Sequence, residues 1–173
     1  VRYSPNTLDG LFLISSCLDG KPMLREGYSG DWIGTFNGHK GAVWSVSINN
    51  LATLVLSASA DFTVRLWNAI NGTFISSYPH KHIVKCAIFG TQGTFFTAGK
   101  EGLIRQFLLP SEKDDNHTQQ EPIHTWKAHD DTIQTLIFFT STSEEHFLLS
   151  CADEKNCKIN KFHLETLYEN INY

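Results

Sequence analysis

The chain has 173 residues, of which 41% are hydrophobic and 12% aromatic, so it can bury a sizeable core and is not a disordered chain. Its formal net charge of −4 argues against a general polyanion binder, which carries a clustered excess of basic residues. The charge is uneven, because residues 1–110 hold nine Lys and Arg against six Asp and Glu, whereas residues 111–173 hold five against twelve.

From the N-terminus onward, one pattern recurs along the chain. An apolar segment with Ser or Thr runs to an acidic residue at Leu13–Asp19, Leu56–Asp61, Phe96–Glu101 and Leu149–Asp153. Before each of the last three stand an aromatic residue, a His and, four residues after the His, a β-branched residue, in Phe36–Val43, Tyr78–Val84 and Trp126–Ile133. A period of ~40–45 residues with Gly-His and Trp-Asp marks predicts WD repeats, each forming a four-stranded blade of a β-propeller.

The segments between these markers are typical of strands. In the second repeat they are rich in β-branched and aromatic residues and are separated by Asn, Asp and Gly, at Val43–Ile48, Thr53–Ser57, Thr63–Trp67 and Thr73–Tyr78. No segment keeps a helical apolar period over three turns. The sequence therefore predicts an all-β WD-repeat β-propeller with blades at about 1–36, 37–78, 79–126 and 127–173, the last ending in an outer strand over Leu167–Tyr173.

Two further features bear on this organisation. Residues 111–121 contain no apolar side chain, which predicts a flexible surface loop between the third and fourth repeats. Cys17, Cys86 and Cys151 lie in apolar, strand-like segments and form no Cys-x-x-Cys pair. They are expected to be buried free thiols, as in a protein of a reducing compartment.

One set of residues has the composition of a Ser-His-Asp triad: His39, Ser57 or Ser59, and Asp61, with Trp67 beside them. We interpret it as a structural tetrad instead. The side chains of His and Asp are expected to meet through a Ser hydroxyl and the Trp indole N–H, which ties a loop to a turn. No nucleophile elbow, phosphate-binding loop or metal-ligand spacing accompanies it, so the sequence predicts no catalytic residue, no metal and no cofactor.

Two longer stretches carry a closer resemblance. They are Phe12–Gly27, which contains Asp-Gly-Lys-Pro-Met-Leu, and Gly30–Trp44; Ala60–Thr63 and His80–Lys85 continue the match. In these stretches the chain resembles the serine-threonine kinase receptor-associated family. That resemblance implies a seven-bladed WD propeller that acts as a non-enzymatic adaptor in receptor-kinase signalling and in the survival-motor-neuron complex, in the cytoplasm or also the nucleus.

The sequence departs from the family pattern at several positions. Asn68 follows Trp67 where Asp is usual, and Phe107 and Phe162 replace the Trp of the third and fourth repeats. Only the second repeat is therefore expected to hold a complete tetrad. About four of seven blades are present, and seven would need roughly 300 residues. With Val1 as its first residue, the sequence is expected to be part of a longer protein.

The loops that enter each innermost strand are expected to cluster on one face of the propeller. They offer Lys40 and Gly41, then Lys81 and His82, then Asp130 and Asp131, with Trp44 and Lys85 just inside the same strands. Exposed Lys, His and Trp side chains there would give an acidic protein partner charge steering and an aromatic anchor. The alternative is that Trp44 belongs to the core and the lysines are merely solvated.

The sequence also bears on other kinds of partner. No apolar run is long enough to enter a membrane as a helix. Residues 40–105 hold six Lys and Arg against two acids, so an RNA-binding or translation-initiation-factor-type WD subunit is the alternative function. Nucleic acid is otherwise expected to be contacted only indirectly.

Overall fold

The computed structural model describes residues 1–91, 93–110, 121–154 and 156–162, and it contains only strands and turns there. None of the described segments forms a helix of the length and apolarity needed to cross a membrane. The expectation of an all-β chain is confirmed. The loop predicted at 111–121 and the strand predicted at 167–173 lie outside the described residues, apart from Glu121.

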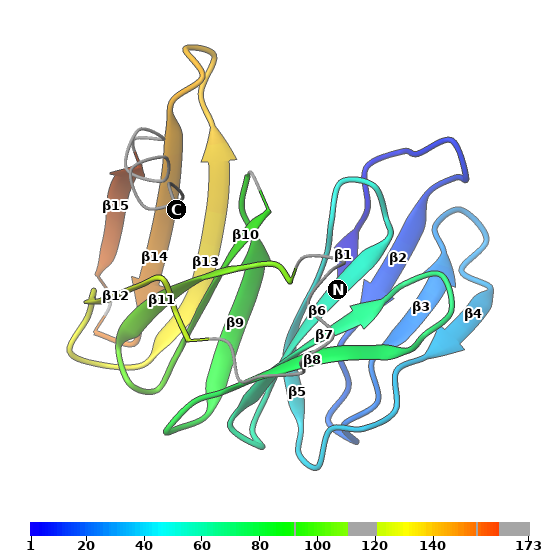
Figure 1. The fold of residues 1–173 in the computed structure, drawn as a ribbon, viewed down its shortest axis with the longest axis horizontal. Helices are drawn as coiled ribbons and strands as arrows, with labels where there is room; N and C mark the ends of the chain where they lie inside the picture. The colour runs from blue at the N-terminus through cyan, green and yellow to red at the C-terminus, as the bar shows by residue number, and fades with distance from the viewer. Residues whose placement is uncertain (92, 111–120, 155, 163–173) are drawn as a thin grey trace, which may run out of the picture.

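The strands form four antiparallel sheets in chain order (Figure 1). The first holds β1 (Arg2–Tyr3), β2 (Phe12–Ser15), β3 (Met23–Glu26) and β4 (Trp32–Thr35). The second holds β5 (Val43–Ile48), β6 (Leu54–Ser59), β7 (Thr63–Asn68) and β8 (Phe74–Pro79). The third holds β9 (Val84–Phe89), β10 (Thr94–Gly99), β11 (Leu103–Leu108) and β12 (His124–Lys127). The fourth holds β13 (Ile133–Thr140), β14 (His146–Ala152) and β15 (Cys157–Phe162).

Each sheet is a simple meander, because every strand pairs with the next one along the chain. β8 and β12 run one residue beyond the expected blade limits of 78 and 126. The reason is that the ladders continue by one pair, Thr63 with Pro79 and Leu103 with Lys127. The first strands of the sheets, β1, β5, β9 and β13, lie side by side, so they form the inner wall of the molecule.

The hydrophobic core consists of three layers, one between each pair of neighbouring sheets. Ile14 and Leu24 pack on the second sheet around Trp67, which also contacts the rings of Phe36 and Phe74. The next layer centres on Tyr78, Phe95 and Phe107, whose ring centroids lie 4.7–5.1 Å apart. The third joins Phe96 and Ile104 to Leu136 and Leu148. Each sheet is thus buried against the next by alternate side chains of its strands.

The cysteines differ in part from the expected free thiols. Cys86 is a buried free thiol, and burial raises its pKa to about 12. Cys17 is free and partly exposed. Cys151 is instead joined to Cys157 in a disulfide. The two residues face each other directly across the ladder of β14 and β15, a pairing that depends on strand register and not on any Cys-x-x-Cys spacing.

Candidate functional site

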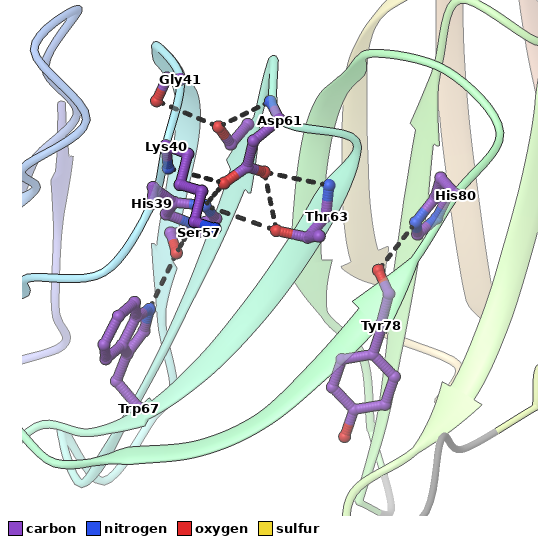
Figure 2. A network of polar contacts seen from close by, with 10 residues as sticks. His39, Lys40, Gly41, Ser57, Asp61, Thr63, Trp67, Tyr78 and His80 are labelled. Atoms are coloured by element: carbon purple, nitrogen blue, oxygen red, sulfur yellow. Dashed lines mark hydrogen bonds and ion pairs between the residues drawn. The ribbon is translucent and has the colours of Figure 1, made fainter.

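A polar network ties the loop before β5 to the turn after β6 (Figure 2). His39 Nδ1 lies 2.7 Å from Asp61 Oδ2, and His39 Nε2 lies 2.7 Å from Ser57 Oγ. The indole N–H of Trp67 donates to the same Ser57 hydroxyl at 2.8 Å. The structure therefore brings His39, Ser57, Asp61 and Trp67 together, and it is Ser57 rather than Ser59 that links the imidazole to the indole.

Ser59 does not bond to the His39 or Trp67 side chains in the described contacts, but its hydroxyl bonds to the backbone of the same turns. Its hydroxyl donates to Gly41 O at 3.1 Å and accepts the Asp61 N–H at 3.1 Å. The Asp61 carboxylate also accepts the N–H of Lys40 at 3.0 Å and the hydroxyl of Thr63 at 2.7 Å. These bonds fix the backbone of the turns from both sides, which is a structural role.

The pKa shifts and the burial of the network are consistent with a structural role. Burial lowers the pKa of His39, although its hydrogen bond to Asp61 opposes the change. Burial alone would raise the pKa of Asp61, but hydrogen bonds from Thr63, Lys40 and His39 outweigh it and lower the pKa to about 2. Ser57 is completely buried, and its hydroxyl is already engaged by His39 and Trp67. It has no contact with solvent from which a substrate would approach.

The third and fourth sheets repeat part of this arrangement. His80 Nε2 lies 2.8 Å from Thr97 Oγ1, while Phe107 occupies the core in place of an indole. His129 is paired with both Ser150 Oγ, at 2.9 Å, and Glu154 Oε1, at 2.5 Å. The fourth repeat thus holds His, Ser and acid together, contrary to the expectation that its acidic residue would be Asp153. The side chain of Phe162 lies outside the described part of the chain.

The spacing of the hydroxyl and acidic residues identifies Glu154. Ser57 precedes Asp61 by four residues, Thr97 precedes Glu101 by four, and Ser150 precedes Glu154 by four. Asp153 lies only three residues after Ser150, and its carboxylate instead accepts from Gln134 Nε2 at 3.0 and 2.9 Å. This four-residue spacing is present in the sequence, and it assigns Glu154 rather than Asp153 to the network of the fourth repeat.

His80 makes the stability of the fold dependent on pH. Burial and the nearby Arg105 charge lower the pKa of His80 to about 4, compared with 6.5 for a His that is fully exposed to solvent. The unfolded chain then binds a proton at higher pH than the folded chain does. We expect the free energy of unfolding to be fully maintained above pH 6.5 and to fall as the pH drops towards about 4.

Urea denaturation of the wild type and of His80→Gln between pH 6.5 and about 4 measures how much His80 contributes to the pH dependence of the unfolding free energy. The amide of the substituted side chain can still bond to Thr97 but does not titrate, so the slope of unfolding free energy against pH is expected to flatten. A residual slope remains from His39, whose pKa shifts in the same direction. An unchanged slope in the variant would contradict the assignment to His80.

The turns at one end of the sheets form a continuous row, which we call the rim; it comprises residues 17–20, 39–42, 60–62, 80–83, 99–102, 128–132 and 153–154. Backbone hydrogen bonds of 2.8–3.0 Å link these turns, or the first residue of β5, from the first sheet to the fourth. They are Val43 N to Cys17 O, Ala60 N to Ala42 O, His80 N to Phe62 O, Lys100 N to Ile83 O, Ala128 N to Gly102 O and Asp153 N to Thr132 O. The entry loops of β5, β9 and β13 therefore share one edge of the molecule.

The residues expected to contact partners lie on or just inside this rim. Lys40, Lys81 and His82 are exposed. The ring centroid of His82 lies 5.8 Å from that of Phe62 in the preceding sheet. Trp44 is 43% exposed, so it is not a core residue. The ammonium of Lys85 lies 3.4 Å from the centroid of the Trp44 ring, which is a cation–π contact between neighbouring inner strands. Lys100 and Phe62, which the sequence did not single out, belong to the same surface.

The chain is similar in sequence to WD-repeat proteins. Residues 30–68 match the family of WD domain, G-beta repeats. The chain is 47% identical over 139 residues to the serine-threonine kinase receptor-associated protein of Dictyostelium discoideum, covering 77% of this chain and 47% of that protein. It is 41% identical over 160 residues to the human protein of that name, covering 92% of this chain and 43% of that protein.

A more distant relative is subunit I of eukaryotic translation initiation factor 3 from Saccharomyces cerevisiae, 24% identical over 180 aligned positions, which cover 99% of this chain and 50% of that protein. The chain spans about half of the length of each of these relatives or less. With the four sheets and the repeated His–hydroxyl pairs, the matches identify the fold as that of a WD-repeat β-propeller.

Proposed function

Because this is a WD-repeat chain that resembles the serine-threonine kinase receptor-associated proteins, we propose that it is a non-enzymatic adaptor which binds other proteins through its rim. The observation that carries the proposal is the unbroken row of hydrogen-bonded turns, which presents Lys40, Lys81 and His82 beside the half-exposed Trp44. We define the docking face as Lys40, Trp44, Lys81, His82 and Lys85.

Two physical features support this choice of surface. The His39 and His129 networks hold the turns of the rim in place, so the surface is preorganised. Binding a partner therefore costs little conformational entropy in these turns. Trp and Lys at a solvent-exposed edge supply a flat apolar contact next to positive charge, the combination that anchors and steers a protein ligand.

The relatives' name suggests a finer function. We propose that the partner is the kinase domain of a serine-threonine kinase receptor. From the resemblance of the sequence to that family, we also propose that the same face serves assembly of survival-motor-neuron ribonucleoprotein complexes. For both roles we propose a location in the cytoplasm, or also in the nucleus.

The test is a binding titration of a purified receptor kinase domain with the wild-type chain and with Lys40→Glu/Lys81→Glu. Reversing two exposed charges on the docking face is expected to weaken binding about tenfold at low ionic strength, mainly through slower association. The melting temperature should not change, because neither side chain enters the His39 network.

The control is Asn6→Glu/Asn50→Glu, which introduces the same two acidic side chains at exposed positions at the opposite end of the sheets. It should bind as the wild type does. Equal binding by all three proteins, or loss of binding only together with unfolding, would rule out the docking face.

A further inference from the structure

The inner wall carries a row of three different side chains just below the rim. Trp44, Lys85 and Gln134 are each the second residue of their strands, β5, β9 and β13. All three line one cavity of about 270 Å³ on the inner wall, together with Arg2 and Ser16. Because the three strands are neighbours, the row runs from aromatic to cationic to amide across three sheets.

The second and third sheets make their part of the rim positive. Lys40, Lys81 and Lys100 are exposed there, and Lys85 lies below them against Trp44. The two carboxylates on the same turns are only partly exposed, since Asp61 bonds to His39 and Thr63, and Glu101 pairs with Arg105 at 2.7 Å. The four lysines outnumber them, so the net charge of this part of the rim is positive. None of the residues found to line the cavity is an Asp or a Glu.

The fourth sheet makes its part of the rim negative. Asp130, Asp131 and Asp153 are exposed, and Asp153 holds the amide of Gln134 at the end of the row. The ammonium groups of Lys127 and Lys158 are close to these turns and donate to the backbone carbonyls of Glu101 and Ala128. They keep their charge, but the three exposed carboxylates outnumber these two groups, so the net charge of this part of the rim is negative. The sign of the exposed charge therefore changes between Lys85 and Gln134, which are on adjacent strands.

We propose that the ligand of this site is a bipolar peptide segment, in which a run of acidic residues adjoins a run of basic residues. An acidic side chain enters the cavity beside Trp44 and Lys85, and the basic run lies over Asp130, Asp131 and Asp153. This proposal rests on the adaptor function and specifies its partner. A uniform polyanion such as single-stranded RNA fits less well, because its phosphates would meet the acidic end of the rim.

The experiment uses fluorescently labelled peptides of equal length, made of a Glu block joined to a Lys block, of Glu alone or of Lys alone, and an oligouridylate. Binding to the chain is measured by anisotropy at low ionic strength. The bipolar peptide is expected to bind most tightly. Asp153→Lys should weaken the bipolar peptide and strengthen the Glu peptide, each about two- to fivefold, because it reverses one surface charge.

Lys85→Glu should weaken both Glu-containing peptides, and Asp9→Lys, in an exposed turn at the far end of the first sheet, should change none of them. The opposite signs expected for Asp153→Lys cannot arise from misfolding. The proposal is overturned if Asp153→Lys shifts both peptides in the same direction, or if the oligouridylate binds more tightly than the bipolar peptide. If the bipolar-peptide proposal is overturned but Lys40→Glu/Lys81→Glu still weakens binding of the kinase domain, the proposed adaptor function stands.

Discussion

His39→Ala and Asp61→Ala are each expected to destabilise the chain by about 1–3 kcal/mol, and the double variant by much less than the sum. Each single change leaves the other buried polar group without its partner at 2.7 Å, whereas the double change removes both. For a chain of this size, 1 kcal/mol corresponds to a fall in melting temperature of roughly 2–4 °C. Chemical denaturation of the four proteins gives the coupling energy directly.

Two controls separate coupling from general damage. Asp153→Ala removes an exposed carboxylate that bonds only to Gln134 among the contacts described, and it should cost about 0.5 kcal/mol or less. His39→Ala combined with Glu154→Ala joins two networks in different sheets, and their losses should add. Additive losses for the His39 and Asp61 pair would show that the two side chains do not stabilise each other.

The sequence predicted the second sheet well because its local signals agree. β-branched and aromatic residues alternate there between turn residues, and the predicted strand at Val43–Ile48 has the bounds of β5. The choice between Ser57 and Ser59 needed the structure. Residues two apart in a strand point to the same side, so both hydroxyls suit the pattern. The positions of the His39 ring and the Trp67 indole select Ser57.

Features that depend on register were beyond the sequence. The disulfide of Cys151 exists because Cys157 returns directly opposite to it in a hairpin, and one residue of slippage would separate them. The exposure of Trp44 likewise follows from which face of β5 lies on the inner wall, where none of the sheets that the structure describes covers the ring. A run such as Val-Trp-Ser-Val does not by itself distinguish these faces.

The rim also depends on one glycine. Gly102 has φ +66° and is buried in the turn after β10, where its carbonyl accepts the N–H groups of Ala128 and His129 at 3.0 and 3.1 Å. A Cβ on Gly102 would collide with the carbonyl oxygen of His129. Because this turn joins the third sheet to the entry loop of the fourth, a side chain there would displace His129 from Ser150 and Glu154.

Gly102→Ala is therefore expected to cost about 2–5 kcal/mol, as the sum of left-handed backbone strain and steric overlap. Gly93→Ala provides the matched control, because Gly93 has φ +70° and nothing within 4 Å of an added Cβ. It should carry the strain alone, about 1–2 kcal/mol. The difference between the two unfolding free energies measures the contact between the third and fourth sheets at the rim. Equal losses would mean that the turn yields without disturbing His129, and that the rim is not held together at this point.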